Sequence, residues 1–553
     1  MKTILSLAIS TVLVGQIATA QQTGSWGDQG NGRYKNPILE SNFPDNDVIL
    51  VGDTFYMMSS TDEFVPGMAI LKSRDLVNWE FSNPIMPAPI TFDQDFNLGS
   101  KVVMANRATW AGSFGYDGTN YFAYWCHNKR GGKGGTCKII YAQTKRMEGP
   151  WSEPKEITWA NGKSIDSTDP GVMWDLETKQ AWLACGGGEI YKMAWDGSKL
   201  LQNEGQGIVV TKTLRGESAK LYKFEGTYYH MNTHALAYEK NVREQVISRA
   251  KTMEGPWESR VILENGNGCD RCPSQGTLLK LDDGSWWFIH QLARGKPEVR
   301  YNGRPQMLEP VTWKDGWPQI GVDTDGNGIG EVVWEHKKPI AGFPITAPAT
   351  DDDFSQPKLG WQWMWRLNPK MDRWSLTERP GFLRLKACVS LPIANKESIK
   401  RLPNLIGQRL MGQHSNVMTA KMDFSGMVVG QEGGLHISSG DNNIIGVKKD
   451  SLGEMSLFFK TDAGTNKAMV VTPGPAIKQT DVWLQARVEK GLATFLYRLD
   501  GEKFTQLGDE VRLLFAGFTP NMVGFYSMNS EEKGHVDVDW FKYDYEGPKG
   551  KAQ

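Results

Sequence analysis

Three carboxylates in the first half of the chain occupy similar places, each directly ahead of an apolar segment with β-strand character. Asp45 lies in FPDND, Asp169 in STDPG and Glu217 in RGESA. If a fold brings the three together, they repel one another unless one stays protonated, and a general acid needs that protonated state. The alternative is that each is a turn or cap residue, as most loop aspartates are. The three acids are therefore candidates for acid–base chemistry.

Other patterns that resemble reactive sites are incomplete. No Walker loop, G-x-G-x-x-G or G-x-S-x-G segment is present. His230 and His234 have the spacing of a zinc-binding helix, but no Glu follows the first His. Their segment also looks extended, which separates the Cα atoms by ~13 Å. A segment starting at Asp323 imitates a calcium loop, but its twelfth position is Trp334 instead of Glu. We therefore expect no metal at either place.

Six cysteines are too few for a disulfide framework in a chain of 553 residues. Cys269 and Cys272 form a C-x-x-C pair, but no second pair at short spacing completes a zinc site. No thioredoxin-like βαβ pattern surrounds them either. We expect a local disulfide or a free thiol pair in a loop.

A turn followed by aromatic residues recurs through the first half of the chain and predicts the elements that carry the three acids. The copies are Gly52–Tyr56, Asp117–Phe122, a degenerate copy at Asp175–Trp182, Glu225–Tyr229 and Asp283–Trp287. A second element recurs as TKRMEGPW, ending at Trp151, and as AKTMEGPW, ending at Trp257. A hairpin that recurs five times predicts the five blades of a β-propeller, in which the innermost strand ends meet at a central channel. A generic β-sandwich explains the near copies less well.

The second half of the chain has a different pattern. Three prolines between 339 and 348 mark a linker, and short runs of alternating apolar and polar residues follow it. Such runs fit one β-sandwich. We therefore expect an all-β chain with a propeller over 21–345, a sandwich over 351–553 and no long amphipathic helix.

Composition and the N-terminus limit the partners and the location. The chain has 62 Lys plus Arg against 63 Asp plus Glu, so it lacks the charge that nucleic acid or an anionic membrane would attract. An apolar run from Ile4 to Val14 after Lys2, followed by Ala-Thr-Ala at 18–20, is typical of a signal peptide. No Cys for a lipid anchor follows the expected cleavage before Gln21. We expect residues 1–20 to be removed and the protein to be exported, to the periplasm or beyond the cell.

The motifs together resemble the inverting glycosidases of glycoside hydrolase family forty-three, in the β-xylosidase and α-L-arabinofuranosidase branch. The resemblance covers essentially the whole mature chain and implies a five-bladed propeller followed by a concanavalin-like β-sandwich. It makes Asp45 the general base, Glu217 the general acid and Asp169 the acid that orients and tunes Glu217. It also implies that Trp110 and Arg304 contact the substrate.

Several positions depart from the family pattern. Asn46-Asp47 replaces a common Pro-Ser, and Ser218-Ala219-Lys220 replaces a common Gly-Pro-His. Gln275 stands where many members have a His that holds a central ion, which argues against a metal in the channel. Asp62 stands where related β-xylosidases have an aromatic residue against the sugar, which is evidence against a plain xylosidase. We count Gln275 and Asp62 among the substrate-binding candidates.

The resemblance leads us to expect an exo-acting α-L-arabinofuranosidase that trims a plant hemicellulose such as arabinoxylan or xyloglucan. A β-xylosidase on xylo-oligosaccharides is the alternative, and a non-catalytic glycan-binding propeller is a third possibility. Inversion requires the carboxyl groups of Asp45 and Glu217 to stand ~6.5–9.5 Å apart. We expect a monomer that needs no cofactor. Acids of the sandwich such as Asp353 and Asp539 have two interpretations: they bind a structural calcium, or they are ordinary residues of surface turns.

Overall fold

The computed structural model describes residues 24–98, 108–129, 136–185, 188–210, 216–237, 242–269, 272–292, 301–391, 399–439, 441–462, 469–515 and 518–549. The expected signal peptide lies outside these residues. Within them, regular structure is β-strand apart from three short 3-10 helices, η1 (Gln94–Phe96), η2 (Met371–Arg373) and η3 (Ile399–Arg401). The expectation of an all-β chain is confirmed. No helix of the described residues is both long and apolar enough to cross a membrane.

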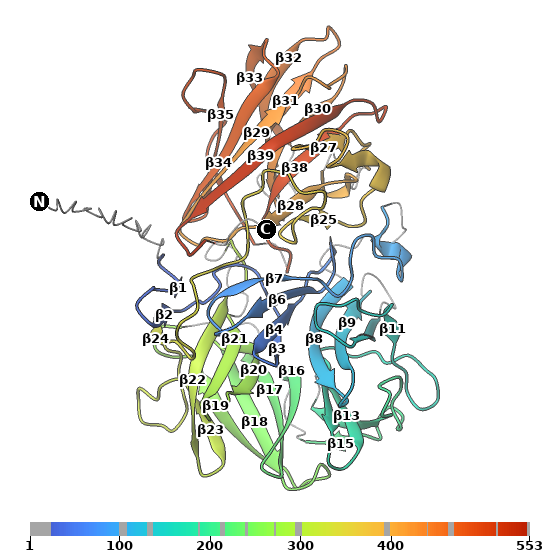
Figure 1. The fold of residues 1–553 in the computed structure, drawn as a ribbon, viewed down its shortest axis with the longest axis vertical. Helices are drawn as coiled ribbons and strands as arrows, with labels where there is room; N and C mark the ends of the chain where they lie inside the picture. The colour runs from blue at the N-terminus through green and yellow to red at the C-terminus, as the bar shows by residue number, and fades with distance from the viewer. Residues whose placement is uncertain are drawn as a thin grey trace, which may run out of the picture.

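Five four-stranded antiparallel sheets form the part of the molecule that is lower in Figure 1. Blade I contains β3 (Asp47–Val51), β4 (Thr54–Ser59), β6 (Ala69–Ser73) and β7 (Trp79–Ser82), and blade II contains β8 (Ala108–Tyr116), β9 (Tyr121–Asn128), β10 (Cys137–Thr144) and β11 (Lys155–Glu156). Blade III contains β12 (Gly171–Asp175), β13 (Gln180–Cys185), β14 (Glu189–Met193) and β15 (Ile208–Val209). Blade IV contains β16 (Gly216–Phe224), β17 (Thr227–Ala237), β18 (Val242–Ala250) and β19 (Glu258–Glu264), and blade V contains β20 (Ser274–Lys280), β21 (Trp286–Gln291), β22 (Gln306–Lys314) and β23 (Trp317–Ile320). The first strand of each blade contacts that of the next, and β20 contacts β3. The ring is closed, so the predicted five-bladed propeller is confirmed.

The repeated turns of the sequence join the first two strands of each blade. Gly52 and Gly226 adopt φ values of 62° and 71°, a region that glycine enters without steric cost. In the degenerate third copy, Lys179 takes up the left-handed conformation with φ 56°. The backbone turn is therefore kept where the glycine of the repeat is lost.

A small sheet outside the blades ties the N-terminal segment to the end of the propeller. It consists of β1 (Gly27–Asp28), β2 (Arg33–Lys35) and β24 (Glu335–Lys337), with β2 in the middle. Its three strands come from both ends of the propeller sequence. The sequence pattern did not predict them.

Two large antiparallel sheets form the part of the molecule that is upper in Figure 1. The first has the order β33 (Val470–Ile477), β32 (Met455–Thr461), β31 (Asn442–Lys449), β30 (Glu432–Ser438), β38 (Met522–Met528), β28 (Ile406–Arg409), β25 (Met364–Arg366) and β5 (Phe64–Val65). The second has the order β26 (Trp374–Ser375), β27 (Leu383–Lys386), β39 (His535–Tyr545), β29 (Ser415–Asp423), β34 (Asp481–Glu489), β35 (Leu492–Arg498) and β36 (Thr505–Gln506), with β37 (Val511–Arg512) also paired to β35. Apolar side chains of both sheets fill the space between them. The predicted β-sandwich is confirmed.

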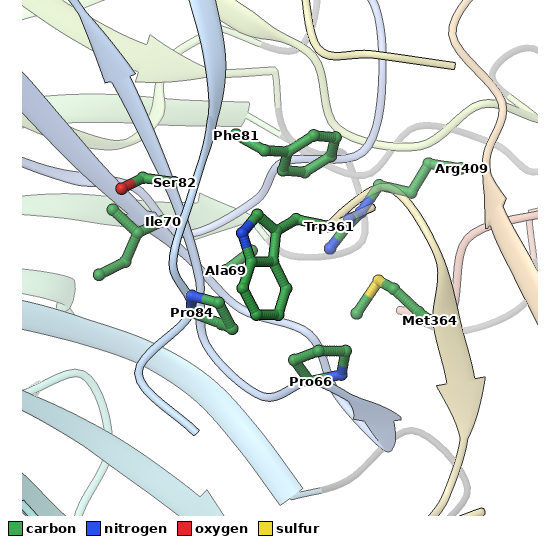
Figure 2. A pocket seen from close by; sticks show the side chains of 9 residues that line it. All are labelled: Pro66, Ala69, Ile70, Phe81, Ser82, Pro84, Trp361, Met364 and Arg409. Carbon is green, nitrogen blue, oxygen red and sulfur yellow. The ribbon is translucent and has the colours of Figure 1, made fainter. Parts of the chain in front are cut away.

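The propeller and the sandwich share one sheet and one apolar core. Strand β5 leaves blade I and pairs with β25 of the sandwich. Beside this pairing, Arg366 forms a buried ion pair with Glu63 at 2.8 Å. Figure 2 shows a hollow at the boundary, where Trp361 and Arg409 of the sandwich face the β6–β7 side of blade I. Its volume of about 10 Å³ barely admits one water, so the two domains are closely packed there.

Two disulfides lie in the propeller. Cys269–Cys272 is the local disulfide that was one of the two expected outcomes. Cys126–Cys137 joins neighbouring strands β9 and β10 and was not predicted. Their Cα atoms stand 5.8 and 5.9 Å apart, within the range of ordinary disulfides.

Candidate active site

The backbone of each blade turns into the left-handed region where its first strand begins or just before it. The residues are Asp45, Ala108, Asp169, Ser218 and Gln275, with φ values of 61°, 76°, 50°, 60° and 52°. Register shifts follow in three of these strands, at 109–112, 217–220 and 274–276. Residues other than glycine pay a steric cost in this conformation, and such strain gathers at functional sites. The repeated device brings side chains from successive blades to one end of the channel.

The Asp45 side chain is buried and is held by two residues of blade V, one at the end of β21 and one just before β22. Arg304 Nη1 donates to Asp45 Oδ1 at 2.9 Å, and Gln291 Nε2 donates to the same oxygen at 3.2 Å. The Asp45 backbone N–H donates to Gln291 Oε1 at 2.6 Å. Three contacts therefore fix both the backbone and the carboxylate of Asp45. Arg304 was predicted from the sequence, whereas Gln291 belongs to none of the sequence motifs.

Asp169 is also buried, and it lies close enough to the other two acids for their charges to act on it. The Ser218 N–H and Gln275 Nε2 both donate to Asp169 Oδ2, at 2.9 and 3.1 Å. Burial, together with the negative charges of Glu217 and Asp45, raises the pKa of Asp169 from 3.8 to about 6. The structure thus brings the three predicted acids together. Gln275, expected among substrate-binding residues, contacts this acid.

Glu217 is the most exposed of the three acids, with 27% of its side chain accessible. Arg243 Nη1 donates to Glu217 Oε2 at 2.6 Å and also lies 3.3 Å from Ser274 Oγ. A carboxylate that is open to solvent on one side and oriented on the other can reach a bound molecule. Arg243 lies 26 residues beyond Glu217 and belongs to none of the sequence motifs.

A phenylalanine from the sandwich reaches the same end of the propeller. The Phe518 ring lies 5.6 Å from the Trp110 ring, and Arg304 Cζ stands 5.2 Å from the centre of the Phe518 ring. Trp110 and Arg304 were both predicted to contact substrate, and Phe518 joins them. The sandwich therefore contributes directly to the wall of the site.

Asp62 is 2% exposed and also has a left-handed backbone, with φ 49°. Its backbone pairs with Thr109 at the start of blade II. Burial raises the pKa of Asp62 well above 3.8, against the opposing effect of Arg304. Within the described residues, Oδ1 of this acid has no hydrogen-bond partner. Asp62 is thus a buried polar group close to the acid cluster, as a substrate-binding residue would be.

The residues of the incomplete metal motifs have other roles. His230 and His234 both lie in strand β17, as the extended interpretation required, and burial lowers the pKa of each to about 4. Asp323 accepts hydrogen bonds from the backbone of Gly326 and Gly328, as in a plain turn. No group of three potential metal-binding side chains occurs among the residues that the structure describes.

The two sandwich acids named as possible calcium ligands are engaged separately. Asp539 forms an ion pair with Lys421 at 2.9 Å. Asp353 accepts the backbone N–H of Ser355 at 3.0 Å, a turn interaction.

Comparisons with known proteins agree with this arrangement. Residues 34–318 match the family "Glycosyl hydrolases family 43", and residues 351–544 match the "Beta xylosidase C-terminal Concanavalin A-like domain". A "Beta-xylosidase" from Formosa agariphila is 39% identical over 97% of this chain and 94% of its own length. A "Non-reducing end alpha-L-arabinofuranosidase" from Bacteroides ovatus is 29% identical over 92% of this chain and 94% of its own length.

The likeness extends to solved structures. A "Bifunctional GH43-CE" protein from Bacteroides eggerthii superposes with a TM-score of 0.78 at 26% identity, and covers 95% of this chain. The chain spans 64% of that longer protein. A family match over residues 34–318 and a relative at 39% identity along nearly the whole chain lead to one conclusion. This protein belongs to family 43 of the glycosyl hydrolases and is a glycosidase.

Proposed function

We propose that this protein is an exo-acting, inverting β-xylosidase that releases terminal xylose from xylo-oligosaccharides. The observation that carries the proposal is the cluster of Asp45, Asp169 and Glu217, each held by its own partners at one end of the channel. The name of the 39% identical relative supports xylose ahead of arabinose. This order reverses the expectation from sequence, which ranked the α-L-arabinofuranosidase first.

The chemistry follows from the positions of the two outer acids. Glu217 donates a proton to the glycosidic oxygen as the bond from that oxygen to the anomeric carbon breaks. Asp45 removes a proton from a water molecule whose oxygen bonds to the same carbon from the opposite face. The transition state resembles an oxocarbenium ion, and the configuration inverts in a single displacement. This mechanism requires ~6.5–9.5 Å between the two carboxyl groups, which leaves room for the water.

Asp169 serves as the acid that orients and tunes Glu217. It is buried beside Glu217, and its pKa of about 6 makes it largely charged at neutral pH. Its negative charge therefore lies beside the group that donates the proton. Asp169 also holds the Ser218 N–H, so it fixes the backbone directly after Glu217.

Exo action is supported by the wall that the sandwich provides. Phe518 stands against Trp110 and Arg304 beside the acids. A wall at this place limits how far a polysaccharide chain extends past the catalytic group. Cleavage at a chain end fits this arrangement better than cleavage inside a long chain.

An α-L-arabinofuranosidase that acts on a hemicellulose side chain is the second candidate. Asp62 favours it, because a buried acid with an unpartnered oxygen stands where related β-xylosidases are expected to have an aromatic ring. The 29% identical relative from Bacteroides ovatus carries the arabinofuranosidase name. The two sugars present a similar set of hydroxyl groups, so a few contacts decide between them.

The test is hydrolysis of 4-nitrophenyl β-D-xyloside and 4-nitrophenyl α-L-arabinofuranoside side by side, with the product anomer followed by NMR. A dominant xyloside rate with inversion supports the proposal. A dominant arabinofuranoside rate contradicts it in favour of the second candidate. No turnover of either sugar, with glycan binding retained, contradicts both and indicates a binding protein.

Variants identify the groups that carry the reaction. Asp45→Asn and Glu217→Gln should each lower kcat by about 10²–10⁴-fold, the usual contribution of acid–base catalysis. Asp323→Asn is the matched control, since Asp323 is an acid of a propeller turn. Near wild-type rates in either of the first two variants would contradict the assigned roles.

A further inference from the structure

A buried ion pair lies in the channel and joins the first strands of blades I and IV. Lys220 Nζ stands 3.4 Å from Asp47 Oδ1 and donates to the Gly112 carbonyl at 2.7 Å. Lys220 is 4% exposed and Asp47 is 5% exposed. Asp47 lies in β3 and Lys220 in β16, and both strands belong to the propeller that is lower in Figure 1.

Asp47 extends the link to two more blades. Its Oδ2 accepts the backbone N–H of Phe114 at 2.6 Å, and its Oδ1 accepts the Thr277 hydroxyl at 2.8 Å. Together with Gly112, these contacts connect Asp47 and Lys220 to the first strands of blades II and V. One pair of charges thus connects four of the five innermost strands.

The same two side chains lie immediately next to the catalytic segments. Asp47 is two residues after Asp45, and Lys220 is three residues after Glu217. Between Glu217 and Lys220 the strand register shifts, and Ser218 has a left-handed backbone. Any movement of Lys220 relative to Asp47 therefore passes through very short backbone segments to Glu217 and Asp45.

Apolar packing does not hold the innermost strands together where the ion pair lies. A cavity of about 320 Å³ borders Asp47, Lys220 and Thr277, so the innermost strands are not held by a solid apolar core at this level. Burying two charges is costly, and an apolar pair of similar volume is often no less stable. A specific geometric role explains a buried pair here better than global stability does.

We propose that the Lys220–Asp47 ion pair is a positioning device that fixes the distance between the general base Asp45 and the general acid Glu217. The inference rests on the proposed roles of these two acids. It assigns to Lys220 and Asp47 no contact with the substrate. They act through the strands that carry the catalytic side chains.

The main test is Lys220→Met, which removes the charge and keeps a long side chain. We expect kcat on the preferred aryl glycoside to fall about 10- to 100-fold, because misplacement of about 1 Å can cost 10²-fold in rate. KM should change less than about 3-fold, since the residues that contact the sugar are unchanged. Substrates with poor leaving groups should lose more than those with good leaving groups, because only the former need a well-placed acid.

Lys338→Met is the matched control. The side chain of Lys338, like that of Lys220, is 4% exposed, and it forms buried ion pairs with Asp28 and, at 2.8 Å, with Asp75, away from the acid cluster. It should lower the melting temperature at least as much as Lys220→Met and leave kcat and the leaving-group dependence unchanged. Equal kcat losses in the two variants would overturn the proposal and indicate a general loss of stability.

Two further variants test whether the effect on kcat comes from the ion pair or from the lysine alone. Lys220→Arg keeps the cation and should recover part of the lost kcat. The double variant Asp47→Asn/Lys220→Met leaves no unpaired buried charge. Its fold-loss of kcat should therefore be smaller than the product of the fold-losses in the single variants Asp47→Asn and Lys220→Met. Additive losses, or no recovery with arginine, would contradict a paired role.

A structural readout separates this proposal from the proposed function. Crystal structures of the wild type and Lys220→Met should differ by at least about 0.5 Å in the separation of the Asp45 and Glu217 carboxyl groups, the tolerance of a productive site. An unchanged separation would overturn the inference even if the wild type is an active glycosidase. A changed separation in a protein without turnover would leave the ion pair established as a spacer and reject only the proposed function.

Discussion

Replacing Asp169 with asparagine should make the protein more stable at neutral pH while it removes activity. Burial and the neighbouring charges of Glu217 and Asp45 together raise the pKa of Asp169 from 3.8 to about 6. The folded state therefore binds a proton more tightly than the unfolded state. For an acid of this kind, the stabilising contribution is present at low pH and is lost as the pH rises from about 3.8 through 6.

The size of the effect follows from the two pKa values. Because the pKa is 3.8 in the unfolded state and about 6 in the folded state, ionisation of Asp169 lowers the free energy of unfolding by about 3 kcal/mol at neutral pH relative to low pH. Asparagine does not ionise, and its side-chain oxygen can still accept the Ser218 N–H. The difference in unfolding free energy between Asp169→Asn and the wild type should therefore rise by about 1–3 kcal/mol between pH 4 and pH 7.5. Activity should fall by about 10²-fold or more, since Glu217 loses the charge that prepares it.

Urea denaturation of both proteins at pH 4 and pH 7.5 measures this difference, and hydrolysis of the preferred aryl glycoside measures kcat. Asp353→Asn is the control, because hydrogen bonds from Ser355 lower the pKa of this exposed acid. Its removal should give a small change of the opposite sign. If Asp169→Asn shows the same stability difference at both pH values, the reasoning about the buried carboxyl is refuted.

Three further results are expected. Phe518→Ala should raise KM for the aryl glycoside roughly 5-fold, the equivalent of about 1 kcal/mol of aromatic packing beside Trp110, and an unchanged KM would show that the ring does not border the sugar. Arg243→Leu should lower kcat about 10-fold because Glu217 loses its 2.6 Å partner, and steady-state kinetics that match the wild type would contradict that orienting role. N-terminal sequencing of the exported protein should begin near Gln21, and an intact Met1 in the exported fraction would contradict the signal peptide.

The blades could be predicted from sequence because a hairpin depends on residues close together in the chain. Gly52 and Gly226 occupy tight turns, and the aromatic residues that follow them pair within the next few positions. Such local rules survive in one sequence without reference to the rest of the fold. The three acids could be found because each lies next to one of these repeated strands.

The partners of those acids depend on the closure of the ring. Gln291 and Arg304 contact Asp45 across 246 and 259 residues of sequence. Phe518 reaches Trp110 from a different domain. No periodicity relates these residues, because their meeting is decided by how five blades and a sandwich pack together.

The all-β class, the five repeated hairpins, the following sandwich and the three acids could all be predicted from the sequence. Turn chemistry, alternation of apolar residues and short motifs act over a few residues, so they can be read along the chain. Three contacts arise only in the folded protein: Gln275 with Asp169, Lys220 with Asp47, and Phe518 with Trp110. Burial and charge depend on which distant segments exclude water from one another, and that is settled only when the ring closes and the sandwich docks on it.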